Sequence, residues 1–239
     1  MDLVVHSAMS SLGHVANGAN DVIDALLAIL GARGTLLMPA HSGDRTDPAQ
    51  WKNPPVPGRW VAKLRRALRP FDPTTTPVRN RGKVAETFLL YPGVRRSRHP
   101  MESVAAKGPK AYRFTATHPL HESEGIRSPL GRLYTAEGHA LLIGVDLSSN
   151  TALHLAEFLS DLPYLKETRV RALVGPNRYE RLRRYPSSST GFVKAEPDLL
   201  RAKAMRVTRD RGAVLRLVHL KPAIDLLVER LKSDPTYLR

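Results

Sequence analysis

The 239-residue chain contains no cysteine. This absence excludes disulfides, thiolate nucleophiles, acyl-cysteine intermediates and zinc sites that need sulfur, and we expect a cytoplasmic protein. The chain also lacks any run of about 18 apolar residues and any amino-terminal signal pattern, so neither a membrane span nor secretion is expected. The hydrophobic fraction of 42% is nevertheless enough for a sizeable core, which excludes general disorder.

Acidic side chains are scarce relative to basic ones. Lys and Arg number 37 against 22 Asp and Glu, and the net charge is +15. From Tyr164 onward the chain has 18 basic and 8 acidic residues, so this third supplies most of the excess. The electrostatic field of this net charge attracts polyanions, whether nucleic acid, acidic lipid or a phosphorylated cofactor. A high arginine content without any particular partner explains the composition equally well.

Aromatic residues are also scarce, at 6% of the chain. Proteins that bind single-stranded nucleic acid usually present aromatic platforms on which bases stack, and this chain has no recognisable motif that reads DNA or RNA. We therefore expect no nucleic-acid partner.

The first forty residues have the pattern of a βαβ unit. Residues 3–5 form a short apolar run that predicts a buried strand, and residues 35–38 predict a second one. Between them, apolar residues repeat at helical spacing over 22–30, and Gly31 follows as a helix terminator. Helices that alternate with short apolar strands predict an α/β sheet covered on both faces.

Regular elements are harder to place after this unit. Seven prolines between residues 42 and 77 leave room for one helix, near 60–68, within a functional loop or lid. Residues 118–132 and the basic stretch after Tyr164 are expected to be irregular. The remaining expected elements are strands at 104–106 and 140–145, a helix that begins near Asn150, and a closing helix at 224–231.

Polar side chains follow three of the expected strands. His6 and Ser7 come after the first, His41 and Ser42 after the second, and residues 146–150 after the strand at 140–145. In open α/β sheets the ligand crevice lies outside the carboxyl ends of the strands. These three loops are therefore the expected site.

The segment around residues 149–157 is the most informative. Ser149 or Asn150 can cap a helix, His154 lies one turn in, and Glu157 follows three residues later on the same face. An imidazole with a carboxylate one turn away is a general base whose tautomer is held by its partner. A half-buried histidine beside a surface glutamate has the same spacing, and the residues alone favour this plainer interpretation.

A metal site is not expected. His118, His121, Glu122 and Glu124 lie within seven residues, but Pro119 interrupts any helix that would align the two imidazoles. 

The Ser-rich segment near the amino terminus does not have the form of a nucleophile motif. Ser7, Ser10 and Ser11 lack the Gly-x-Ser-x-Gly context of a nucleophile elbow, which favours capping or cofactor contacts. No Walker loop and no Gly-x-Gly-x-x-Gly sequence is present, so nucleotide hydrolysis and nicotinamide chemistry are not expected.

Eight longer motifs follow one another along roughly residues 3 to 165. They are HSAMSSLG at 6–13, GTLLMP at 34–39, WKNPPVP at 51–57, FDP at 71–73, ETF at 86–88, RSRHP at 96–100, SPLGRLY at 128–134 and NTALHLAE at 150–157. In order and content these motifs resemble the aminoglycoside 3-N-acetyltransferase family.

The resemblance implies a fold and a reaction. The fold is a three-layer α/β/α sandwich with a mixed central sheet, which we expect to form one domain over residues 1–239, with a core at 1–163 and a basic carboxyl-terminal part at 164–239 that completes it. The reaction is direct acetyl transfer from acetyl-CoA to the 3-amino group of an aminoglycoside, which confers antibiotic resistance. The oligomeric state, including a homodimer, is left open.

The resemblance also assigns residues. His154 is the general base, Glu157 and Glu86 orient it or hold the cationic sugar, and Thr151 donates to the oxyanion or the departing thiolate. The expected coenzyme A contacts are His6, Ser7, Ser10, Ser11, Ser128 and Pro129. The expected contacts to the amine acceptor are Glu86, Glu157 and Asp161, with Glu122 and Glu124 as further acidic candidates.

Two alternatives remain for the partner. A net charge of +15 repels a polycationic aminoglycoside at long range, which leaves room for another small amine as the acceptor. A basic nucleic-acid-binding protein on an inactive acetyltransferase scaffold is the other alternative, with the chain after Tyr164 as its contact surface.

Overall fold

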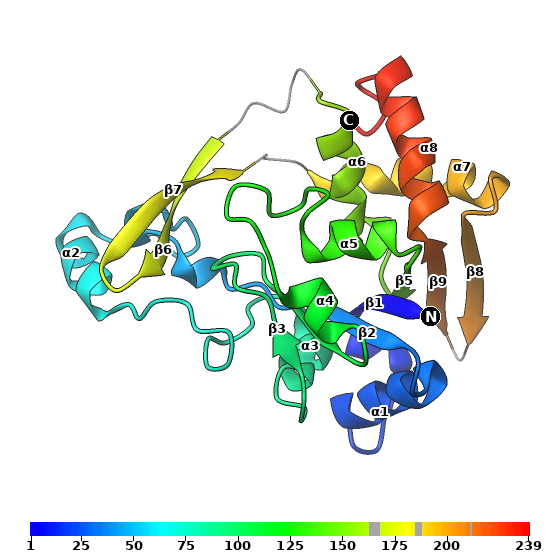
Figure 1. The fold of residues 1–239 in the computed structure, drawn as a ribbon, viewed down its shortest axis with the longest axis horizontal. Coiled ribbons are helices and arrows are strands. Elements are labelled where there is room, and N and C mark those ends of the chain that lie inside the picture. The colour runs from blue at the N-terminus through cyan, green and yellow to red at the C-terminus, as the bar shows by residue number, and fades with distance from the viewer. Residues whose placement is uncertain (163–167, 185–187, 211) are drawn as a thin grey trace.

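A seven-stranded mixed sheet with helices on both faces forms the body of the molecule (Figure 1). The computed structural model describes residues 1–162, 168–184, 188–210 and 212–239. The strand order is β3-β4-β2-β1-β5-β9-β8. The strands are β1 (Asp2–Ser7), β2 (Thr35–Pro39), β3 (Arg95–Arg96), β4 (Val104–Lys107), β5 (His139–Ile143), β8 (Met205–Asp210) and β9 (Ala213–His219).

The centre of the sheet is parallel and its flanks are antiparallel. β1 pairs in parallel with β2, with Leu3 opposite Leu36, and with β5, with Val4 opposite Ala140. β4 and β9 run antiparallel to β2 and β5. The carboxyl ends of β1, β2 and β5 therefore meet at one edge of the sheet.

Helices cover the two faces of the sheet because strand side chains alternate between them. Leu3 and Val5 pack in the cluster that contains α1 and α3, whereas Val4 packs in the cluster on the opposite face. The first face carries α1 (Ala19–Leu30) and α3 (Gly82–Phe88). The second carries α4 (Ala111–Thr115), α5 (Pro129–Thr135), α6 (His154–Leu159), α7 (Glu196–Arg201) and α8 (Leu220–Ser233). The expected three-layer α/β/α fold with a mixed sheet is confirmed.

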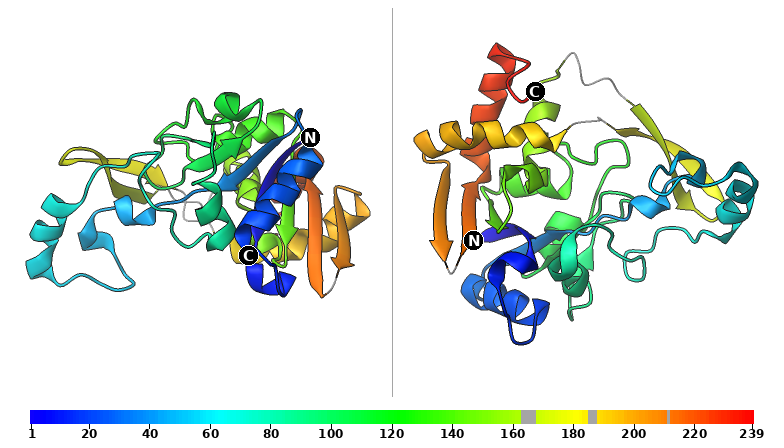
Figure 2. Two further views of the ribbon diagram at one scale, coloured as in Figure 1. Left: turned by 90° about the horizontal axis from the view of Figure 1, so that it is seen from below. Right: turned by 180° about the vertical axis from the view of Figure 1, so that it is seen from behind.

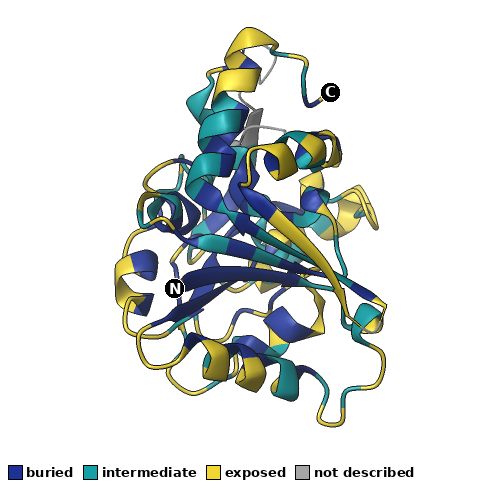
Figure 3. Cartoon of the chain, turned by 90° about the vertical axis from the view of Figure 1, so that its right-hand side faces the viewer, coloured by how far each residue is buried: buried dark blue, intermediate teal, exposed yellow. Residues whose placement is uncertain are grey.

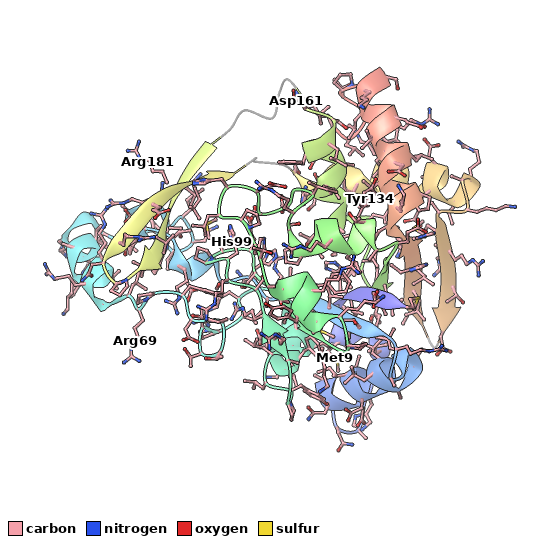
Figure 4. All side chains as sticks on the ribbon, in the orientation of Figure 1. Met9, Arg69, His99, Tyr134, Asp161 and Arg181 are labelled. Atoms are coloured by element: carbon pink, nitrogen blue, oxygen red, sulfur yellow. The ribbon has the colours of Figure 1, made fainter. Side chains whose placement is uncertain are left out.

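A small second sheet lies at the end of the molecule away from β8 (Figure 2). β6 (Thr168–Gly175) and β7 (Arg178–Arg184) form an antiparallel hairpin beside α2 (Gly58–Ala67). Asp47 ties the two parts together, because its carboxylate accepts from Arg65 of α2 at 2.8 Å and from Arg171 of β6 at 3.0 Å. Figure 4 shows Arg69 and Arg181 at the periphery of this end.

Short 3-10 turns connect several of these elements. They are η1 (Met9–Leu12), η2 (Gly43–Arg45), η3 (Pro48–Gln50), η4 (Leu147–Ser149), η5 (Thr151–Leu153) and η6 (Ser189–Ala195). Along the described residues, no helix combines the length and the apolar character that a membrane crossing requires.

The structure departs from the expected elements in three places. The α-helix expected to begin near Asn150 begins at His154 instead, after the turns η4 and η5, so His154 is not one turn into it. The segment at 118–132 is not a loop to its end, because Pro129 starts α5 and the Ser128 hydroxyl caps that helix. The basic stretch after Tyr164 is not irregular, since β6 to β9 and α7 lie in it. β8 was hidden because only its first residue, Met205, is buried, and no apolar alternation marks it as a strand.

Two isoleucines of α1 test how the sheet face is covered. Ile23 is fully buried, whereas Ile29 in the same helix is 79% exposed. We expect Ile23→Ala to lower the free energy of unfolding by about 2–5 kcal/mol, because a cavity remains where the side chain packed. Ile29→Ala is the matched control and should stay within about 0.5 kcal/mol. Equal losses in denaturant unfolding would contradict this placement of α1.

Candidate functional site

A cavity of about 480 Å³ lies at the edge where the carboxyl ends of β1, β2 and β5 meet. Its size is within the usual range for small-molecule sites. All three strand-end loops contribute to it, as the sequence predicted. Its polar and charged lining consists of His6, Ser7, His41, Asn80, Arg81, Glu102, Glu124, Ser148, Ser149, Thr151, His154 and Ser189.

Two short 3-10 turns, η4 and η5, follow β5 and lead the chain to His154 in this cavity. The Asn150 side chain accepts from the amide of Ala152 at 3.3 Å and so caps η5, and α6 then begins at His154. One turn later, Glu157 Oε2 lies 2.6 Å from His154 Nδ1. A carboxylate only accepts, so Nδ1 carries the proton and the lone pair of the neutral ring is on Nε2.

This pair is buried. The His154 and Glu157 side chains are 12% and 6% exposed, and the Phe192 ring lies 4.8 Å from the imidazole, centroid to centroid. Burial is the largest single influence on the His154 pKa and lowers it. The carboxylates of Glu124, Glu157 and Glu102 together outweigh burial, and the His154 pKa is raised above its usual value.

Two other imidazoles of the same cavity behave in the opposite way. Burial, reinforced by the charge of Arg81, lowers the pKa of His6 to about 3 and holds the pKa of His41 well below its usual value. Both rings are therefore neutral at physiological pH. His6 Nε2 has no hydrogen-bond partner among the described residues. The cavity thus combines one basic imidazole with two neutral ones.

Arg96 holds the loops of this edge in place. Its buried guanidinium donates to the carbonyls of Ala40 and Thr76 and, at 2.8 Å, to the hydroxyl of Ser103. Burial lowers the pKa of Arg96 to about 10, which leaves it charged at neutral pH. The arginine therefore connects the end of β2, which leads to His41, with the segment that precedes α3.

The structure brings part of the predicted site together. His154 and Thr151 line the cavity together with His6 and Ser7 from the end of β1, and Glu157 contacts His154. The predicted catalytic residues therefore lie in one place with two of the predicted coenzyme A contacts.

The other predicted coenzyme A contacts are not part of the cavity lining. Ser10 is exposed on η1, and the Ser11 hydroxyl donates to the Ala8 carbonyl at 2.7 Å. The Ser128 hydroxyl is fully buried and accepts from the Gly131 amide at 3.0 Å, with Pro129 buried beside it. In this structure Ser11 and Ser128 stabilise local turns.

Three predicted acidic contacts also lie apart from the cavity lining, among them Glu122, which pairs with Arg127 at 2.7 Å. Glu86 is exposed on α3, and Asp161 is exposed beyond the end of α6 (Figure 4). The acidic side chains that do line the cavity are Glu102, which precedes β4, and Glu124. Glu102 was missed, although an antiparallel orientation of the predicted strand at 104–106 places its first residues at this edge.

Asn80, Arg81 and Ser189 were also missed. They come from the segment before α3 and from η6, and no sequence pattern connects either with the strand ends. 

His118 has a structural role. His118 Nδ1 lies 2.9 Å from the Ser97 hydroxyl and its Nε2 lies 2.8 Å from the Ser123 carbonyl, so both ring nitrogens are engaged within the protein. Within the described part of the chain, no group of three or more histidines and carboxylates is arranged to hold a metal ion.

The chain matches a family model over nearly its whole length and curated proteins over about two thirds of it. The family model of aminoglycoside 3-N-acetyltransferases matches residues 4–232. A prophage-derived aminoglycoside N(3')-acetyltransferase-like protein of Bacillus subtilis, YokD, is 41% identical over 70% of this chain, and aminoglycoside N(3)-acetyltransferase IX of Micromonospora chalcea is 38% identical over 67%. The matched regions span only 61% and 56% of those two proteins.

Solved structures have the same fold. The crystal structure of YokD from Bacillus subtilis superposes with a TM-score of 0.91 at 33% identity and covers 99% of this chain and 88% of that one. The structure of AAC-IIIb in a binary complex with CoASH has a TM-score of 0.83 at 29% identity and covers 97% of this chain and 90% of that one.

The contrast between the imidazoles gives a prediction for NMR titration of the histidine rings. We expect His154 to titrate above pH 6.5, because three carboxylates stabilise its charged form. Glu157→Gln should move this titration to lower pH, since the amide keeps a hydrogen-bond acceptor but removes a negative charge. His6 is the internal control and should not titrate between about pH 5 and 8. A wild-type His154 signal that titrates below pH 6.5 would overturn the assignment.

Proposed function

The chain belongs to the aminoglycoside 3-N-acetyltransferase family, and we propose that it transfers the acetyl group of acetyl-CoA to the 3-amino group of an aminoglycoside. The observation that carries the proposal is the buried His154–Glu157 pair, with a Nδ1–Oε2 distance of 2.6 Å, beside a cavity with acidic side chains. The AAC-IIIb complex with CoASH supports coenzyme A as the acyl carrier.

Acetyl transfer to an amine needs a base. A protonated amine has no lone pair, so the nitrogen must first release its ammonium proton to solvent before it attacks the thioester carbonyl. In the proposed mechanism the neutral amine attacks, His154 Nε2 accepts a second proton from the nitrogen as the C–N bond forms, and Glu157 stabilises the resulting imidazolium. The C–S bond then breaks, and the proton passes from His154 to the departing sulfur, which leaves as the thiol. The chain has no cysteine to carry an acyl group, which fits direct transfer.

Hydrogen-bond donors are needed where negative charge develops. The hydroxyl of Thr151 lines the cavity close in sequence to His154 and is proposed to donate to the oxyanion or to the thiolate. Ser7 and the neutral ring of His6, at the end of β1, are proposed to contact the acyl donor. The unpartnered Nε2 of buried His6 supports a polar ligand there, because buried polar atoms normally have partners.

The acidic lining supports a cationic acceptor. Glu124 and Glu102 stabilise positive charge on His154, so they stabilise positive charge on an amine at the same place. The family assigns this role to an aminoglycoside.

A smaller amine is a second candidate. Arg81 lines the same cavity as Glu102 and Glu124, and the chain has a net charge of +15. Both features disfavour a ligand with several positive charges and favour an amine with one.

The proposed base is tested with His154→Ala. We expect the rate of thiol release from acetyl-CoA in the presence of an aminoglycoside to fall by about 10²–10⁴-fold, because general-base catalysis contributes that much. His14→Ala, which removes an exposed imidazole, should leave the rate within about twofold. Calorimetry should show that acetyl-CoA still binds to the His154 variant. Near-normal turnover by that variant would remove His154 from the mechanism.

The acceptor is tested with a panel of amines. Deoxystreptamine aminoglycosides and small monoamines are compared by kcat/KM in the same thiol-release assay. An aminoglycoside as the best acceptor, with the acetyl group found on its 3-amino nitrogen by mass spectrometry and NMR, supports the proposal. Preference for the monoamines favours the second candidate. Binding of acetyl-CoA without turnover of any amine would contradict both.

A further inference from the structure

A second cavity lies where β5 begins, at the opposite end of this strand from the cavity that contains His154. It has a volume of about 230 Å³, and its lining residues are His139, Lys203, Ala204, Met205, Arg206, Leu217 and His219. His139 is the first residue of β5, whereas the other end of that strand leads to His154. Figure 3 looks onto this side of the molecule, with the exposed strand β8 at the front.

Two imidazoles stack beside this cavity. His139 and His219 are paired across β5 and β9, and their rings are parallel to within 7° with centroids 4.6 Å apart. Nδ1 of His139 and Nε2 of His219 are buried and have no hydrogen-bond partner among the described residues. The nearest carboxylate oxygen, on Glu137, is 4.0 Å from His219 Nε2, which is too far for a hydrogen bond.

Two cations complete the lining. The side chains of Lys203 and Arg206 make no hydrogen bond or ion pair with any described residue, whereas nearby Arg201 and Arg216 are paired with Asp198 and Glu196. His219 is also the residue before α8, a helix of 14 residues, and its side chain does not cap that helix. The positive end of the helix dipole therefore lies next to the cavity.

We propose that this cavity binds a phosphate group, either inorganic phosphate or a phosphomonoester. A phosphate offers several acceptor oxygens and close to two negative charges, which match two ring nitrogens, an ammonium and a guanidinium. A metal ion does not fit, because Lys203 and Arg206 would repel it. The site lies apart from the proposed catalytic machinery, so it does not depend on the acetyl-transfer proposal.

Occupancy changes the charge balance at the two histidines. Burial, His219 and the amino-terminal ammonium lower the pKa of His139 in the ligand-free protein. The positive charges of Lys203 and Arg206, which line the same cavity, act in the same direction, and the carboxylate of Glu137 near His219 opposes them. A phosphate dianion stabilises the imidazolium, so its binding raises the pKa of His139.

The experiment follows the ring signals of His139 and His219 by NMR in the full chain, without coenzyme A. Inorganic phosphate and phosphoserine are the two probes, and sodium chloride at equal ionic strength is the control. We expect saturable shifts of both rings and an upward shift of the His139 pKa with at least one probe. A preference for phosphoserine identifies a phosphomonoester as the ligand, and a preference for phosphate identifies the free ion. Shifts that chloride reproduces, or no shift, would refute the site.

Variants of the residues that line the cavity distinguish specific phosphate binding from general attraction of the anion to a basic protein. Lys203→Gln combined with Arg206→Gln should raise the phosphate Kd at least tenfold. Glu137→Gln should lower it about twofold to threefold, because it removes the opposing charge. Arg209→Gln is the matched control, since Arg209 is exposed on the same strand but does not line the cavity. Equal effects of the double variant and Arg209→Gln would show that net charge alone attracts the anion.

Discussion

The site depends on one buried contact, in which Glu157 Oε2 lies 2.6 Å from His154 Nδ1 and accepts its proton in a hydrogen bond. A buried carboxylate is costly unless it is paired, and the histidine supplies the pair. The contact needs helical spacing, a helix that starts at His154, and the Asn150 cap that directs the chain into that helix after β5. The parallel pairing of β5 with β1 then brings this helix start beside His6. Helix geometry therefore places Glu157 against His154, and sheet topology places this pair beside the end of β1.

The same cavity keeps imidazoles in different protonation states through their neighbours. Burial acts on all three imidazoles in the direction of a lower pKa, yet the pKa of His154 is raised overall and those of His6 and His41 are lowered. The difference is that His154 faces carboxylates, whereas His6 and His41 face Arg81. One cavity can therefore hold an imidazole that is proposed to take a proton together with two imidazoles that stay uncharged.

Two spatial features follow from regular helix and sheet geometry and were predicted from the sequence, whereas the burial of Glu157 was not. His154 and Glu157 are three residues apart, and the polar groups after β1, β2 and β5 converge because parallel strands end at one edge. Glu102 and Arg81 reach the cavity through long-range packing of β4 and α3, which no local pattern reveals. The strand β8 was missed for a different reason, because its exposed positions carry polar and charged residues and obscure any apolar alternation.

The charge of the chain acts on two length scales. A net charge of +15 attracts a polyanion such as coenzyme A from a distance and repels a polycation. At physiological ionic strength this field decays over about 8 Å, so an amine inside the cavity responds mainly to the nearest groups. Those near His154 are the carboxylates of Glu102, Glu124 and Glu157. The long-range field therefore favours the approach of anions, whereas the local carboxylates favour positive charge beside His154. A protein with a large positive net charge can therefore still stabilise positive charge on a ligand beside His154, as the proposed transfer to an amine requires.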